Sequence, residues 1–153
     1  MCSQKITQTP SDKPNAGDSG FFTLLSASDI CDLPEPEWLI DGILPSSGLA
    51  SIYGPSGVGK TFVCLDLAAT VANGSEWFGY QTRQSKVVYI ALEGQAGFPR
   101  RVRAWTKHHS TPFPNDVRFV FDQFDITNPK HPASLGSLIK DCDGAGLIVI
   151  DTL

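Results

Sequence analysis

One eight-residue segment limits the possible folds of this chain more than any other. Residues 54–61 read Gly-Pro-Ser-Gly-Val-Gly-Lys-Thr and fit the pattern G-x-x-x-x-G-K-[ST] at every position. The glycines allow the backbone to curl so that successive N–H groups point inward at an anion. A helix that starts near Lys60 directs the positive end of its dipole to the same place. The segment therefore predicts a phosphate-binding loop.

The neighbouring sequence favours this interpretation over an ordinary glycine-rich turn. An apolar run at 49–53 predicts a buried strand before the loop, and the apolar stretch 61–72 predicts a helix after it. In that context Lys60 reaches the β- and γ-phosphates of a nucleotide, and the Thr61 hydroxyl ligates Mg²⁺. We expect the nucleotide to contact Gly54, Pro55, Ser56, Gly57, Val58, Gly59, Lys60, Thr61 and Phe62.

A first acidic candidate ends the last apolar run of the chain. Residues 147–150 are Leu-Ile-Val-Ile and are followed by Asp151, so the carboxylate is expected at the tip of a buried strand. There it could hold the Mg²⁺ through a water, beside Thr61. An apolar run followed by Asp is common by itself. Its place downstream of a phosphate loop and after a third predicted strand is what favours the metal role.

A second acidic candidate, Glu93, follows the apolar run 86–92. In a parallel sheet it projects at the same edge as the phosphate loop. A carboxylate there could orient and deprotonate the water that attacks the γ-phosphate. The alternative is an ordinary strand-end Glu that pairs with Arg100 or Arg101.

The chain divides into three parts. Residues 1–20 are polar and rich in Pro and Gly, and are expected to form a disordered leader. Residues 21–48 are expected to take an extended path that docks Trp38 and Leu39 on a core, because Pro34 and Pro36 disfavour a helix there. Residues 49–153 predict an α/β fold, a parallel sheet flanked by helices. Its strands are expected at 49–53, 86–92, 117–121 (at a sheet edge, since Arg118 interrupts it) and 147–151, and its helices at 61–72, 98–108 and 132–142.

Composition excludes several classes of protein. With 153 residues, 41% of them hydrophobic, and a net charge of −4, the chain is one domain or part of one and is not a strongly basic nucleic-acid coat protein. It has no run of 18 apolar residues and no secretory signal pattern, so we expect no membrane span. The four cysteines are widely spaced, which excludes a zinc ribbon and indicates the reducing cytoplasm. Cys64 is expected to be a small buried hydrophobe.

Weaker signals have structural explanations. The basic residues after Glu93, with Trp105 among them, are interpreted as a solvated helix face with Trp105 in the core, the alternative being a patch for a phosphate backbone. His108 and His109 lack acidic or cysteine partners at ligand spacing and are interpreted as a polar helix end. Trp38 is expected to pack against the sheet rather than stack on a base. Asp-Cys-Asp-Gly at 141–144 precedes its strand and N-K-x-D is absent, so a GTPase is disfavoured.

The motifs together resemble the RecA-like P-loop ATPases of the AAA type, and most closely the RepA-type hexameric replicative helicases of plasmids and phages. The resemblance covers about residues 30–153. It depends on WLIDGILP at 38–45, GLASIYGP at 48–55, VYIALEG at 88–94, RVRAW at 101–105 and IVIDTL at 148–153. It implies a RecA-like fold and an ATPase that uses ATP and Mg²⁺. It also implies catalytic roles for Glu93 and Lys60, metal binding by Thr61 and Asp151, a homo-oligomeric ring, and single-stranded DNA as the partner of the full-length protein.

Members of that family continue past the strand equivalent to 147–151 into a further core strand, arginine fingers and DNA-contacting loops. We therefore expect this chain to be an N-terminal fragment, incomplete at its C-terminus and nearly inactive alone, because two buried strands would lack their shared neighbour. Two other functions remain open. One is a nucleotide-sensing regulatory ATPase without unwinding activity, and the less favoured one is a P-loop kinase for a small metabolite.

Overall fold

A computed structural model describes residues 24–141 and 143–151. The chain forms two units, Met1–Glu35 and Pro36–Leu153. In the first, helix α1 (Ala27–Cys31) begins at a capping box, in which the Ser26 hydroxyl accepts from the Asp29 amide and the Asp29 carboxylate accepts from the Ser26 amide. No residue of α1 is buried. The extended path predicted for residues 21–48 is wrong over Ala27–Cys31, because the Ser26–Asp29 capping box starts a helix there. The predicted leader, residues 1–20, lies outside the described residues.

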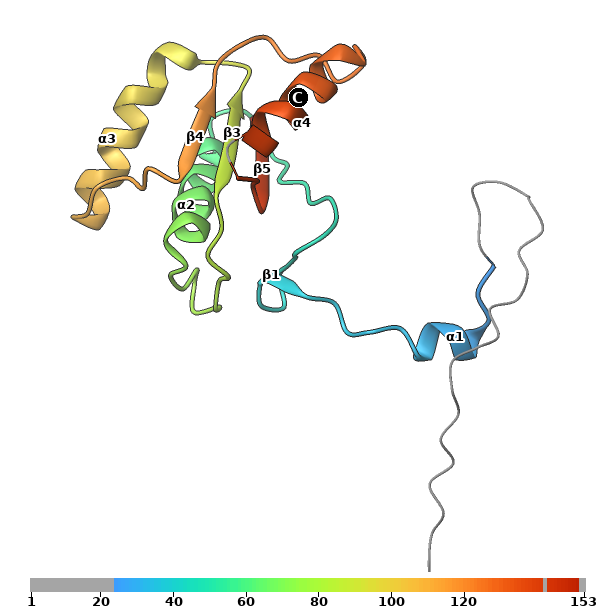
Figure 1. Cartoon of the computed structure of the whole chain (residues 1–153). Coiled ribbons are helices and arrows are strands. Elements are labelled where there is room, and N and C mark those ends of the chain that lie inside the picture. Colours follow the sequence, from blue (N-terminus) through green and yellow to red (C-terminus); the bar gives the residue numbers. More distant parts are fainter. Residues whose placement is uncertain (1–23, 142, 152–153) are drawn as a thin grey trace, which may run out of the picture. The chain divides into compact units, whose positions relative to one another are not determined.

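The second unit is built on a three-stranded parallel sheet (Figure 1). Its central strand, β3 (Val87–Ala91), is buried at every position, as expected for a strand covered on both faces. Strands β4 (Val117–Val120) and β5 (Leu147–Asp151) flank it in the order β4-β3-β5. Ala91 pairs with Asp151 at the last position of the β3–β5 ladder, so the carboxyl ends of these strands meet at one rim. The predicted strands 86–92, 117–121 and 147–151 are thereby confirmed, and so is the edge position of 117–121.

The helix after the phosphate loop, α2 (Lys60–Asn73), packs against all three strands, and α3 (Phe98–His109) lies beside it (Figure 1). Both confirm predicted helices. Helix α2 ends where Gly74 takes a left-handed conformation, with φ of 63°, and the Gly74 amide donates to the carbonyl of Val71. One core joins Leu65, Ala68 and Val71 of α2 to the sheet residues Val87, Tyr89 and Val149.

The remaining elements of this unit are short. Strands β1 (Trp38–Ile40) and β2 (Leu44–Pro45) form a small antiparallel ribbon, and η1 (Gln95–Gly97) is a 3₁₀ turn that leads into α3. Helix α4 (Lys130–Asp141) confirms the prediction at 132–142 and buries none of its described residues. Within the described ranges, no helix is long and apolar enough to cross a membrane.

One predicted strand, at residues 49–53, is wrong. Residues 49–53 form no strand, and Leu49 and Tyr53 are 100% and 92% exposed. The segment pairs with neither edge strand of the sheet, β4 or β5, so its backbone groups have no strand partner among the described residues. An apolar run becomes a strand only where a neighbour can satisfy its backbone groups.

Two burial predictions also need correction. Leu39 is buried as expected, together with Ile40, but Trp38 is 37% exposed and is not a core residue. Trp38 stays exposed because the ribbon is held by the two residues after it. The Leu39 carbonyl accepts from the Arg83 amide, and Ile40 forms a β-bridge with Thr82. Cys64, expected in the core, is only half-buried and packs against its margin.

Candidate functional site

The predicted phosphate loop leads directly into α2. Gly57 and Gly59 have φ values of 81° and 96°, in the left-handed region that glycine adopts without strain. Gly59 is the N-cap of α2 and provides no side-chain cap. Its carbonyl accepts from the amides of Phe62 and Val63 at 2.9 and 3.1 Å, which closes the first turn. The positive end of the helix dipole therefore lies at the loop, as the motif predicts.

Lys60 folds back over this loop. Its ammonium donates to the carbonyl oxygens of Gly54 at 2.9 Å and Pro55 at 3.0 Å. The loop residues themselves are mostly exposed, with Val58 at 62% and the neighbouring Phe62 at 51%. The Lys60 ammonium is thus bound to a loop that is accessible to solvent and to ligands.

Asp151 lies at the end of β5 and is buried, with 7% of its surface exposed. Its Oδ2 accepts a hydrogen bond of 2.8 Å from the hydroxyl of Tyr89 on β3. Its charge also acts on Cys64 of α2, whose pKa is raised to about 11, by burial first and by Asp151 second. Thr61 precedes Cys64 by three residues and shares its side of the helix. The structure thus brings β5 against α2 and Asp151 close enough for its charge to reach Cys64, one turn after Thr61.

Glu93 emerges from the same end of the sheet. The backbone ladder extends one residue past β3, because the Leu92 amide donates to the Asp151 carbonyl at 2.8 Å, and Glu93 follows. Its side chain is exposed and makes no hydrogen bond or ion pair with any described residue. The alternative pairing with Arg100 or Arg101 is not formed among the described residues. The Arg101 guanidinium instead bonds to the Gly94 carbonyl at 3.3 Å and lies 5.0 Å from the centre of the Phe98 ring.

The donor set suits Mg²⁺ and does not form a protein-only metal cage. Among the described residues, no three His, Cys, Asp or Glu side chains gather into a possible metal site. Thr61 and Asp151 together offer one hydroxyl and one carboxylate. Mg²⁺ is commonly held by one or two such groups together with waters and substrate phosphates.

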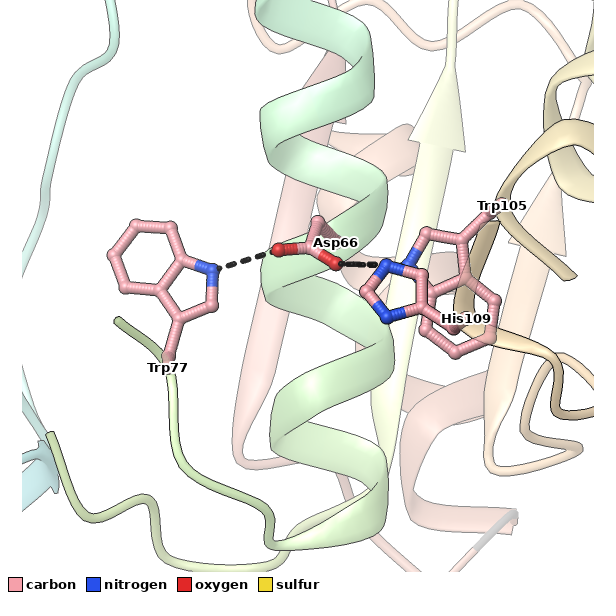
Figure 2. Close-up of polar contacts among 4 residues, drawn as sticks. All are labelled: Asp66, Trp77, Trp105 and His109. Atoms are coloured by element: carbon pink, nitrogen blue, oxygen red, sulfur yellow. Dashed lines mark hydrogen bonds and ion pairs between the residues drawn. The ribbon is translucent and has the colours of Figure 1, made fainter. Parts of the chain in front are cut away.

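A cluster centred on Asp66 was not anticipated from the sequence (Figure 2). From α2, its Oδ1 accepts from the Trp105 indole at 2.9 Å and pairs with His109 Nε2 at 3.1 Å, while its Oδ2 accepts from the Trp77 indole at 3.2 Å. Trp105 is buried as expected and stacks on His109 with ring centres 4.3 Å apart. His109 therefore has the acidic partner that its own segment lacks. The available signal was Asp66 itself, a carboxylate within an apolar helix.

Comparison with protein families gave one match. A family model described as an AAA domain matches residues 17–153, nearly the whole chain. No curated protein and no solved structure matches.

Proposed function

The chain belongs to the AAA domain family of ATPases, and we propose on that premise that residues 54–62 bind Mg·ATP and that the acids beside them promote its hydrolysis. The main support is the arrangement of the rim. Asp151 ends the strand that packs on α2, and its charge acts on Cys64, one turn after Thr61. Glu93 leaves the adjacent strand one residue beyond the last hydrogen bond shared by β3 and β5.

In this proposal Lys60 exchanges its two carbonyl partners for phosphate oxygens. Its present bonds to Gly54 and Pro55 are made to uncharged acceptors. An ammonium bonds more strongly to an anionic oxygen than to a neutral one, so a bound triphosphate can displace the carbonyls. The freed carbonyls lie in an exposed loop and can be hydrated.

Thr61 and Asp151 would hold the Mg²⁺, which supplies charge stabilisation at the β- and γ-phosphate oxygens when bound. The Thr61 hydroxyl oxygen would bind the ion directly, and Asp151 would accept from one of its waters. Because Asp151 already receives the Tyr89 hydroxyl, its carboxylate is fixed before any ligand arrives.

Glu93 would act as the general base. Its carboxylate takes a proton from a water, the water oxygen bonds to the γ-phosphorus, and the bond from that phosphorus to the β–γ bridging oxygen breaks to release ADP. An exposed carboxylate without a competing partner is able to reach such a water.

The finer proposal is a motor domain of a RepA-type replicative helicase that works as a homohexameric ring on single-stranded DNA in the cytoplasm. It is supported by the motif sequence at 38–55, 88–94, 101–105 and 148–153. A nucleotide-sensing regulatory ATPase would use the same rim residues without moving along a polymer. A small-metabolite kinase is the least supported, because a kinase needs a bound acceptor where Glu93 would hold water.

Nucleotide binding is tested with Lys60→Ala. Loss of the only side-chain ammonium on the loop should weaken binding of a fluorescent ATP analogue by 10-fold or more, at about 1.4 kcal/mol for each factor of 10. The matched control is Lys140→Ala, which removes an exposed ammonium from α4. Equal affinity of the Lys60→Ala and Lys140→Ala proteins would exclude residues 54–62 as the site.

A further inference from the structure

A buried tyrosine on β3 contacts the candidate metal ligand. Tyr89 is fully buried, and its hydroxyl donates to Asp151 Oδ2 at 2.8 Å. Asp151 is itself buried, with 7% exposure. A carboxylate removed from water in this way needs hydrogen-bond partners, and Tyr89 supplies one from the neighbouring strand.

The tyrosine ring cannot easily turn away. It packs edge-on against Phe98 of α3, with centres 5.5 Å apart and planes at 69°, and it lies tilted against Phe119 of β4, also at 5.5 Å. Phe98 and Phe119 contact each other as well, at 5.9 Å. The hydroxyl therefore has a fixed position and direction, set by elements on the α3 side of the sheet.

The Tyr89 hydroxyl is the donor in its hydrogen bond to Asp151, because an ionised carboxylate has no proton to give. It occupies Oδ2 and leaves Oδ1 of Asp151 without a hydrogen bond from any described residue.

We propose that Tyr89 is a positioning residue, which holds the Asp151 carboxylate with one oxygen engaged and the other available to the Mg²⁺ of bound Mg·ATP. This inference rests on the proposed function, since Asp151 must hold the ion through one of its waters for the orientation of the carboxylate to matter. It adds a role for a residue that carries no charge and touches no substrate. Partners behind a metal ligand typically change metal affinity by 10–100-fold when removed.

The test is Tyr89→Phe, which deletes the hydroxyl and keeps the ring between Phe98 and Phe119. The matched control is Tyr80→Phe, the same deletion on a half-exposed ring outside this contact. A fluorescent ATP analogue is bound to the full chain while Mg²⁺ is titrated, and again in EDTA. Thermal unfolding is recorded for each protein.

The expected result is a Mg²⁺ midpoint about 10-fold higher in Tyr89→Phe than in wild type. Affinity for the analogue in EDTA should be unchanged, because the loop is untouched, and Tyr80→Phe should behave as wild type. An unchanged Mg²⁺ midpoint in Tyr89→Phe would overturn the inference while the Mg²⁺ response of the wild type upholds the proposed site.

Other outcomes are equally decisive. If affinity in EDTA falls together with the Mg²⁺ response, or if Tyr89→Phe is unfolded, the hydroxyl has a general structural role and the positioning role is overturned. If the wild type binds the analogue equally with and without Mg²⁺, the metal role of Asp151 fails, and the inference fails with it.

Discussion

Asp151 and Glu93 are two carboxylates at one rim of the sheet, in opposite environments. Asp151 is buried and receives the Tyr89 hydroxyl, whereas Glu93 is exposed and accepts no hydrogen bond from the described residues. A group that binds a metal benefits from a fixed orientation, and a general base needs access to water. Each environment therefore matches the role proposed for its residue.

Glu93→Gln separates binding from chemistry. The amide has the size of the carboxylate but cannot accept a proton from water, so ATP turnover of the full-length protein should fall by about 10²–10⁴-fold. Nucleotide affinity should stay near the wild-type value, because Glu93 lies outside the loop. Steady-state phosphate release and analogue binding measure the two quantities.

The control for that substitution is Glu35→Gln, which neutralises an exposed carboxylate of the first unit. It should leave turnover unchanged. Turnover by the Glu93→Gln protein at the control rate would show that another group activates the water.

At the scale of elements, the Asp66 carboxylate joins two helices that adjoin the candidate site, α2 and α3. Helix α2 begins with Lys60 and Thr61, and α3 begins five residues after Glu93. Asp66 links them through Trp105 and His109, and links both to the segment after α2 through Trp77 (Figure 2). The cluster holds α2, the helix that follows the phosphate loop, against α3, the helix that follows the candidate base.

Asp66→Asn should therefore destabilise the fold. The amide has only one acceptor oxygen for the three donors and directs its own N–H groups at some of them, at a cost of about 1–3 kcal/mol in the free energy of unfolding. Urea denaturation followed by tryptophan fluorescence measures this loss, and Trp77 and Trp105 report on it directly.

Asp122→Asn is the matched control, since Asp122 is exposed and makes no hydrogen bond with the described residues. Its free energy of unfolding should equal that of the wild type. The same value for Asp66→Asn would mean that the cluster does not hold the helices together.

Elements set by local sequence were predictable, and those set by distant partners were not. The apolar runs of β3 and β5 and the Gly74 stop of α2 are local features, and the structure has these elements within two residues of their predicted bounds. Residues 49–53 are also largely apolar, but they pair with no described strand. Asp66 and His109 lie on different helices, so no spacing in the sequence could reveal their contact.

The same distinction applies to the site. The phosphate loop and its position before α2 could be predicted from one contiguous motif. Glu93 and Asp151 could be predicted because each ends an apolar run. The Tyr89–Asp151 hydrogen bond required knowledge of the strand register, in which Tyr89 pairs with Val149 and Ala91 with Asp151. The Tyr89 hydroxyl bonds to a residue two positions beyond Val149 on the neighbouring strand, and no sequence motif predicts that contact.

At the scale of the whole molecule, the question is what ATP hydrolysis would drive. A helicase and a regulatory sensor share every rim residue considered above. Family membership supports the ATPase and leaves the driven process open. The exposed basic residues of α3, Arg100, Arg103 and Lys107, are solvated around the buried Trp105, in agreement with their structural interpretation. Only a response to nucleic acid separates the two functions.

Single-stranded DNA should therefore stimulate ATP turnover of the full-length protein several-fold if it is a helicase. The stimulation should weaken as salt rises, because binding to a phosphate backbone releases counterions. Phosphate release with and without an unstructured oligonucleotide measures it, and heparin at equal charge controls for a general polyanion effect. Equal turnover in all three conditions would favour the sensor, since a motor that moves along a strand must couple its hydrolysis to that strand.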